Sequence, residues 1–305
     1  KLAPDAVLLP ADFDEYRRYS RMFKQAVREI APQVEDRGID EIYIDLTELV
    51  MTDTAGKPLD PWVRARDLAA QIQQHVHDAT GLSCSIGVTP NKLLSKIASE
   101  LEKPAGITIL RESDLHARIW PLAVRKINGI GPKANAKLEA LGIRTIAELA
   151  QADVALLVEN FGRSYGAWMN DAAHGRDERP VVTYSEPKSI SRETTFENDL
   201  HAVADRAALS RIFTELCERV AADLLRKGYA TKTIGIKLRF DDFKTVTRDH
   251  TIDLPTQDAA TILRAARECL KRVPLERRIR LLGVRTGALS LPGQITAARA
   301  PQLFE

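Results

Sequence analysis

The stretch from Leu115 to His174 constrains the fold more than any other feature, because no strand pattern occurs in it. Its predicted helices are short and are separated by single glycines at positions 129, 131, 142 and 162. The residues on either side mix strand and helix patterns, so this helical stretch divides the chain. With 305 residues, of which 44% are apolar, the sequence predicts an α+β protein of two or three domains.

The region before the helical stretch alternates between the two patterns. Helices are predicted over residues 11–31, with Asp12 as the cap, over 60–79, ending at Gly81, and over 90–102, with Pro90 at the start. Strands are predicted over residues 39–46, 83–88 and 107–110. Alternation of this kind indicates an α/β layer within residues 1–114.

The region after it, residues 188–291, has the order β-α-β-β-α-β. Strands are predicted over residues 188–196, 231–240, 245–254 and 279–289, and helices over 199–227 and 256–272. This order fits a four-stranded sheet covered by two helices. Residues 175–187 are polar and contain two prolines, which predicts an interdomain linker, and residues 292–305 form a short tail.

The composition excludes several classes of protein. No run of 18 apolar residues could span a membrane, and the first residues lack the apolar core of a secretory signal. Three widely separated cysteines make neither a disulfide framework nor a zinc site, which indicates a reducing cytoplasm. The net charge of +2 divides into −4 up to Glu186 and +6 beyond it. A basic final third suggests a polyanion as the partner of that part.

Residues 126–142 carry a glycine motif that begins Lys-Ile-Asn-Gly-Ile-Gly-Pro-Lys. Gly129 and Gly131 permit a tight turn, and Pro132 opens the next helix. The backbone N–H groups at the start of that helix face outward, and Lys133 adds positive charge, which together make a phosphate site. This is the pattern of a helix–hairpin–helix, which grips nucleic-acid backbone without reading its sequence. The alternative is a plain helical hairpin.

Asp40 and Glu41 form an adjacent pair of carboxylates at the start of a predicted strand. Such a pair can hold Mg²⁺ together with substrate phosphates, and two metal ions can clamp the attacking and leaving oxygens of phosphoryl transfer. Neighbours in a regular strand point to opposite faces, so both reach one site only if the strand begins or bulges there. Gly38 makes such a break possible. The alternative is a solvated acidic pair.

Three lysines accompany the third predicted helix. Lys92 and Lys96 are four residues apart and therefore share a helix face. Lys103 lies just past the helix, before Pro104, where it could contact a triphosphate as a point charge. The alternative is a solvated helix with amphipathic lysines.

In this order, the motifs resemble the Y family of translesion DNA polymerases, most closely its bacterial DNA polymerase IV branch. The family's Ser-Ile-Asp-Glu-Ala-Tyr-Leu-Asp segment is matched by residues 38–45, and its Gly-Val-x-Pro-Asn-Lys to Lys-Pro-x-Gly segment by residues 87–106. Residues 188–196 match the opening of its last domain. The resemblance covers essentially the whole chain. It implies a multidomain α+β fold with a partial α/β palm (1–114), a helical helix–hairpin–helix thumb (115–174) and a βαββαβ little finger (188–291).

The resemblance also implies an activity, that of an error-prone DNA-directed DNA polymerase for lesion bypass in DNA repair. Such an enzyme transfers a nucleotide from a deoxynucleoside triphosphate to the primer 3′-hydroxyl of primer–template DNA. Asp40 and Glu41 would be the catalytic carboxylates that hold two Mg²⁺ ions, and Lys103 would bind the triphosphate. A monomer in the cytoplasm, without membrane contact, is expected.

Two further sets of contacts are implied. DNA would be held by the hairpin and by a basic sheet face of the little finger. The residues concerned are Gly129, Gly131 and Lys133 in the hairpin, and Lys188, Arg192, Lys237 and Arg239 on the strands. In the tail, Gln302, Leu303 and Phe304 resemble a shortened form of the family's sliding-clamp-binding peptide, which would place a few apolar anchors in a groove.

The chain also departs from the family pattern. The family begins with a strand carrying an Asp-x-Asp-x-Phe-Phe/Tyr motif, whose first Asp completes the metal site, and this sequence has no such strand. Gly38 and Ile42 replace a serine and a small residue. We therefore expect little polymerase activity from these 305 residues by themselves, whereas a longer parent protein would be active. The alternative functions are a non-catalytic polymerase-like subunit that binds DNA and a clamp, and a helix–hairpin–helix repair nuclease or glycosylase.

Overall fold

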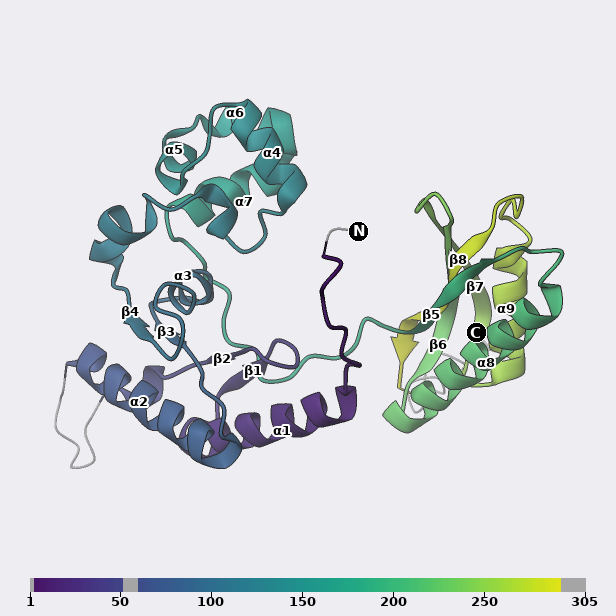
Figure 1. Cartoon of the computed structure of the whole chain (residues 1–305), viewed down its shortest axis with the longest axis horizontal. Coiled ribbons are helices and arrows are strands. Elements are labelled where there is room, and N and C mark those ends of the chain that lie inside the picture. Colours follow the sequence, from purple (N-terminus) through teal and green to yellow (C-terminus); the bar gives the residue numbers. More distant parts are fainter. Residues whose placement is uncertain (1–2, 52–59, 292–305) are drawn as a thin grey trace, which may run out of the picture. The chain divides into compact units, whose positions relative to one another are not determined.

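The computed structural model describes residues 3–51 and 60–291, and the chain divides between Tyr184 and Ser185 into two compact units (Figure 1). The first unit contains all the predicted palm and thumb elements, and the second contains the predicted little finger. Among the described residues, no helix is long and apolar enough to cross a membrane.

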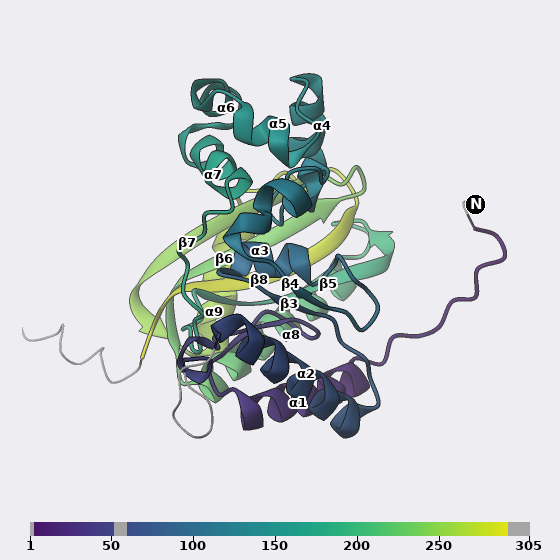
Figure 2. The same cartoon turned by 90° about the vertical axis from the view of Figure 1, so that its left-hand side faces the viewer.

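The first unit begins with two long helices that lie side by side, α1 (Phe13–Ile30) and α2 (Pro61–Thr80) (Figures 1 and 2). Two small sheets accompany them. One is the antiparallel pair β1 (Val34–Asp36) and β2 (Ile42–Ile44), and the other is the parallel pair β3 (Ile86–Val88) and β4 (Ile107–Ile109). Strand β1 was not predicted, because three residues with two carboxylates show no alternation.

Helix ends follow the expected capping in two cases and differ in a third. The side chain of Asp12 accepts hydrogen bonds from the N–H groups at the start of α1, and α2 ends at Gly81 with a left-handed φ of 71°. Helix α3 (Lys92–Ala98) is shorter than the predicted 90–102. It starts after Pro90, because the Asn91 side chain caps it by accepting from Leu94 N at 3.0 Å.

The remainder of the first unit is helical, as predicted. It contains α4 (Pro132–Ala140), α5 (Ile146–Gln151), α6 (Val154–Phe161) and α7 (Arg163–Ala173), which lie together at the top of Figures 1 and 2. Their core continues into α3, where Leu93, Leu94 and Ile97 are buried with Ile119 and Leu138. The apolar core therefore crosses the predicted palm–thumb boundary at residue 114, and that boundary stays a prediction.

Much of the predicted linker is fixed on the first unit. Residues 175–182, here termed the strap, run past the start of α3. The Asn91 side chain donates to the carbonyl of Gly175 at 2.8 Å, and Asp177 accepts from Leu93 N at 3.0 Å. The strap therefore satisfies backbone groups at a helix start that would otherwise lack partners.

The second unit is one four-stranded antiparallel sheet with two helices. Its elements are β5 (Ser189–Leu200), α8 (Arg206–Lys227), β6 (Ala230–Phe240), β7 (Thr245–Thr256), α9 (Ala259–Leu270) and β8 (Ile279–Ser290). The strand order is β5-β8-β6-β7, so the last strand lies in the middle of the sheet (Figure 1). The predicted β-α-β-β-α-β order is present, with boundaries shifted by a few residues.

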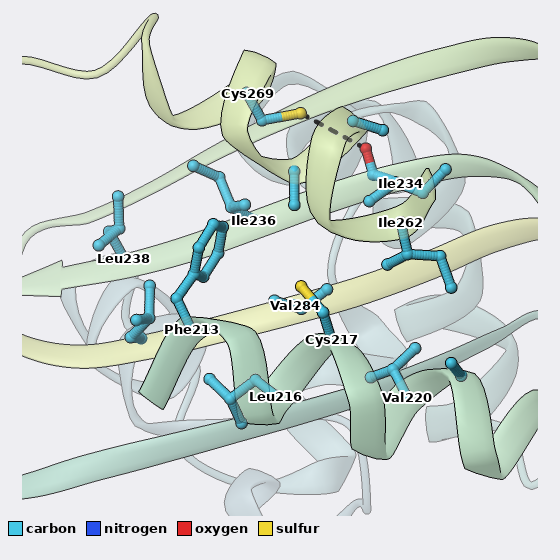
Figure 3. Packing of buried hydrophobic residues seen from close by; sticks show 14 of the residues in the cluster. Phe213, Leu216, Cys217, Val220, Ile234, Ile236, Leu238, Ile262, Cys269 and Val284 are labelled. Carbon is cyan, nitrogen blue, oxygen red and sulfur yellow. Dashed lines mark hydrogen bonds between the residues drawn. The ribbon is translucent and has the colours of Figure 1, made fainter. Parts of the chain in front are cut away.

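Helices α8 and α9 cover one face of this sheet and bury a continuous core (Figure 3). Ile234, Ile236 and Leu238 alternate along β6 and are almost fully buried against Phe213 of α8 and Ile262 of α9. Because side chains alternate along a strand, Lys237 and Arg239 lie on the opposite, uncovered face. The core thus fixes which basic residues face solvent.

Candidate functional site

The turn between β1 and β2 carries the predicted carboxylate pair. Asp40 and Glu41 lie immediately before β2 and not within a strand. Gly38 has a φ of 128°, and its N–H donates to Asp36 Oδ1 at 3.0 Å, while Arg37 N donates to Glu41 O at 3.0 Å. The break that would allow both carboxylates to serve one site is therefore present, since strand alternation starts only after them.

A row of alternating charges connects this turn to α3. Lys96 forms an ion pair with Glu41 and lies 3.6 Å from Glu100, and Lys103 pairs with Glu100 at 2.6 Å. Burial lowers the pKa of Lys96, but the two carboxylates outweigh it and the net pKa is raised. The hydrogen bond from Lys103 is the largest of the effects that lower the pKa of Glu100. The pKa shifts of Lys96 and Glu100 thus both favour the charged forms of these two side chains.

These side chains border one cleft of about 990 Å³ in the first unit, lined by Asp40, Glu41, Asp45, Lys96 and Lys103 among others. The sequence prediction grouped Asp40, Glu41 and Lys103, and the structure places all three at this cleft. Glu100, which connects the two lysines, was missed, although its spacing from Lys96 and Lys103 was readable as helical ion pairs.

The donor set can be compared with what a magnesium ion requires. Mg²⁺ keeps several waters and binds through one or two carboxylates plus substrate phosphates, so the exposed Asp40 and Glu41 fit it chemically. In the parts of the chain that the structure describes, no group of three or more His, Cys, Asp or Glu side chains is arranged to hold a metal.

Lys92 has a different environment from the other lysines of α3. Its side chain is only 10% exposed and pairs with the equally buried Glu35 at 2.7 Å. Its ammonium also donates to the carbonyl of Pro180 at 2.7 Å, and Glu35 accepts from Val182 N at 2.9 Å. Burial raises the pKa of Glu35, but these bonds outweigh it and the net pKa is lowered. Lys92 therefore binds the strap to the unit, and although it belongs to the lining of the cleft, its charge is paired with Glu35.

The glycine motif forms a tight turn before α4. Gly129 has a φ of 115°, and a Cβ there would lie 2.5 Å from Trp168, so no other residue fits without a shift. The hydroxyl of Tyr165 donates to Gly129 O at 2.6 Å and fixes the turn. Gly131 caps α4, and Lys133 is exposed in the first turn beside backbone N–H groups without intrahelical partners. The helix before the turn is a single 3₁₀ turn, Val124–Lys126.

The uncovered face of the second unit carries a mixture of charges. Lys237 pairs with Glu193 at 2.9 Å, and Arg285 lies 3.3 Å from Asp249. Arg239 donates to the Thr245 hydroxyl at 3.1 Å. A row of glycines and threonines separates these charges, with Gly283 opposite Lys237 and Gly235 opposite Arg285. Both glycines are buried, because the Asp249 carboxylate lies over Gly235 and the Glu193 side chain lies over Gly283.

Arg192 does not belong to that face. Its guanidinium makes two bonds to Asp223 of α8, at 2.6 and 2.9 Å, and so lies on the side that the helices cover. The expectation of one basic face that includes Arg192 is corrected, because the alternation of β5 turns this residue toward α8 together with buried Ile190. Lys188 is exposed just before β5. The clamp-binding prediction for Gln302, Leu303 and Phe304 lies outside the described residues and stays a prediction.

Comparisons with known proteins assign successive segments of the chain to the same family. The impB/mucB/samB family matches residues 1–100, its C-terminal domain matches residues 187–302, and the IMS family HHH motif matches residues 112–143. The fold is similar to a solved Y-family DNA polymerase chimera, with a TM-score of 0.79 over 95% of this chain and 80% of that one, at 22% identity.

Curated relatives are more similar in sequence. DNA polymerase IV of Caulobacter vibrioides is 36% identical over 93% of this chain and 67% of its own length. DNA polymerase IV of Alkalilimnicola ehrlichii is 36% identical over 95% and 78%, and that of Streptomyces coelicolor is 35% identical over 95% and 58%. The chain thus spans 58% to 78% of the length of these relatives. It belongs to the impB/mucB/samB family, the Y family of DNA polymerases, in which its relatives are DNA-directed DNA polymerases named DNA polymerase IV.

Proposed function

We propose that this chain is part of a DNA-directed DNA polymerase of the lesion-bypass type, which extends a primer 3′-hydroxyl with deoxynucleoside triphosphates. The observation that carries the proposal is the gathering of Asp40, Glu41, Lys96 and Lys103 at one cleft. Carboxylates that bind a cation and lysines that bind phosphate are what nucleotidyl transfer needs within a few ångströms of each other.

The acidic and basic residues of the cleft would have different roles in nucleotidyl transfer. Asp40 and Glu41 would hold Mg²⁺, which when bound neutralises phosphate charge and orients the reacting oxygens. Lys103 is 54% exposed, so it can leave Glu100 and bind a triphosphate, while Lys96 keeps the Glu41 carboxylate in position. Catalysis of this kind rests on positioning and on neutralising charge more than on covalent chemistry.

The remaining DNA contacts would come from backbone and surface charge. The N–H groups at the start of α4, with Lys133 and the turn at Gly129 and Gly131, suit one phosphate of a duplex. Lys188, Lys237 and Arg239 of the second unit suit further phosphates, without reading the base sequence. Binding would therefore weaken steeply as salt is raised.

Primer extension tests the proposal. The 305-residue chain is compared with Asp40→Ala on a primed template with Mg²⁺ and all four nucleotides. We expect Asp40→Ala to abolish whatever extension the unchanged chain supports, because the substitution removes one of the two adjacent carboxylates at the cleft. Lys103→Ala should raise the KM for the nucleotide.

Duplex binding is measured beside it by anisotropy between 50 and 200 mM salt, with Lys133→Ala as a variant that affects binding only. Extension that survives Asp40→Ala would contradict the assignment of the site. Salt-sensitive binding without extension, in this chain and in a form joined to a family N-terminal segment, would favour the non-catalytic DNA-binding subunit.

A further inference from the structure

The hairpin between β6 and β7 ends in an unusual residue. Phe240 N donates to Lys244 O at 3.0 Å, which leaves a three-residue loop, 241–243, and Phe243 N donates back to Phe240 O at 3.0 Å. The last position of such a loop is left-handed and favours glycine. Here it is Phe243, with a φ of 63°.

Burial gives little reason for phenylalanine at this position. A left-handed backbone is unfavourable for a bulky residue, and Phe243 is 65% exposed, so little apolar burial offsets it. The loop is already held by its neighbours. Asp242 accepts from Lys244 N at 3.0 Å, and Arg277 pairs with Asp241 at 2.9 Å. Strain kept at an exposed side chain points to a use for that side chain.

The surroundings of the ring are basic and partly open. The guanidinium of Arg280 lies 5.0 Å from the ring centroid and 3.5 Å from Asp199, and Lys244 lies 3.8 Å from Asp242 with its side chain 82% exposed. Arg278 uses its guanidinium on the backbone carbonyl of Asp199, so its charge is not matched by that contact. An aromatic face backed by a guanidinium and flanked by cations suits a planar base attached to a phosphate.

We propose that Phe243 and Arg280 form a stacking platform for an unpaired base of single-stranded DNA. The ring would stack on the base with the face that Arg280 leaves open, and Lys244 and Arg278 would contact the flanking phosphates. The proposal rests on the proposed function for the choice of DNA as the ligand. It adds a site at the hairpin tip, apart from the uncovered sheet face, and one that responds to bases and not only to phosphate charge.

The test separates bases from backbone. Affinity of the 305-residue chain is measured by anisotropy for labelled oligothymidylate and for an oligomer of equal length made of abasic sites, beside a primer–template duplex. We expect oligothymidylate to bind more tightly than the abasic oligomer. Phe243→Gly should remove that preference, a loss of about fivefold to tenfold on the base-bearing oligomer alone, as one stacked base predicts. Phe243→Trp should keep it.

Two controls make the result decisive. Leu225→Ala removes another exposed apolar side chain, 61% exposed on α8, and should leave both affinities unchanged. The melting temperature of Phe243→Gly should equal or exceed that of the unchanged chain, because glycine suits the left-handed position. A lower melting temperature would assign the ring to folding and overturn the proposal.

The remaining binding results distinguish failure of the stacking platform from failure of the proposed function. Equal binding of the two oligomers, or full oligothymidylate binding by Phe243→Gly, would overturn the platform and leave the ring to a protein partner. In both cases salt-sensitive duplex binding would leave the proposed function intact. Failure to bind any of the three DNAs would overturn the platform and the proposed function together.

Discussion

The two units differ in how their strands are packed. In the second unit, strands of 11 or 12 residues form one sheet over one core. In the first unit, four strands of three residues form two separate pairs, and Ile42, Ile44, Ile86 and Val88 are only half-buried beside the cleft. The candidate catalytic residues therefore lie on the less completely packed framework. Regions with fewer buried contacts open more readily, which suits a site that must admit a large substrate.

The largest expected effect compares the same truncation in the two units. Ile236→Ala removes a side chain 2% exposed in the core of the second unit and should destabilise that unit by roughly 2–5 kcal/mol. Ile42→Ala, beside the cleft, should cost less than about 1 kcal/mol, because water already reaches part of the side chain. Native-state hydrogen exchange, followed separately in α8 and α2, measures both. Equal losses of unfolding free energy in the two variants would show that the difference in packing does not affect stability.

The buried ion pair under the strap gives the next effect. Lys92→Met removes the ammonium that pairs with the buried Glu35, leaving it only Arg37 at 3.6 Å, and should destabilise the first unit by about 3 kcal/mol. Trypsin should then cut after Arg176 faster, because the strap loses its attachment, whereas Arg179 is followed by Pro180 and is not a trypsin site. Adding Glu35→Gln to Lys92→Met should recover part of the stability, since the uncompensated charge is gone. Lys96→Met, at the more exposed pair with Glu41, is the matched control and should cost less.

Lowering the pH should weaken the stabilisation that comes from the ion pair between Lys92 and Glu35. The folded pKa of Glu35 is lowered, so its pairing contributes stability above its unfolded pKa of about 4.3, and this contribution is lost as the pH falls through the folded pKa. The stability difference between the unchanged chain and Glu35→Gln, roughly 2 kcal/mol at pH 7, should therefore shrink toward pH 3. Urea unfolding of the first unit at a series of pH values measures it. A difference that is constant over this range would show that the ion pair is not its source.

The smallest effect separates two arginines of the second unit. Arg192→Met should reduce stability by about 1 kcal/mol, since the pair with Asp223 is partly exposed, and should leave duplex affinity unchanged. Arg239→Met should do the opposite, reducing the salt dependence of binding by about one ion without a change in stability. Thermal unfolding and anisotropy of both variants decide this. A loss of duplex affinity in Arg192→Met would return that residue to the DNA surface.

The contrast between the units also explains what the sequence allowed us to predict. Strands of 11 or 12 residues with alternating isoleucines, as in Ile234 and Ile236, leave a clear period, so every element of the second unit was predicted. Three of the four three-residue strands were predicted within longer apolar stretches, and β1 was missed because two of its three residues are carboxylates. The start of α8 was placed seven residues early, at 199, because β5 continues through a bulge to Leu200.

For the site residues, the chemical role was easier to predict from the sequence than the burial and the interaction partners of the side chain. Asp40, Glu41 and Lys103 were found because carboxylates and lysines carry recognisable roles in a known order. Lys92 and Lys96 are four residues apart and look alike in sequence, yet Lys92 is buried against Glu35 whereas Lys96 is more exposed and pairs with Glu41. Arg192 was placed on the wrong face for the same reason, since the residue across from it, Asp223, lies 31 positions away. Such partners follow only from the tertiary fold.

The strap has a consequence for how two DNA-binding surfaces cooperate. It is held as far as Val182, and β5 begins at Ser189, so only residues 183–188 connect the units freely. Six residues extend to about 20 Å at most, so the start of β5 stays within roughly that distance of the end of the strap. If both proposed surfaces bind DNA, then once one is bound the local concentration of the second would be on the order of millimolar. Two linked surfaces that each bind DNA weakly would in this way bind it tightly together, and one could dissociate and rebind while the other stays bound.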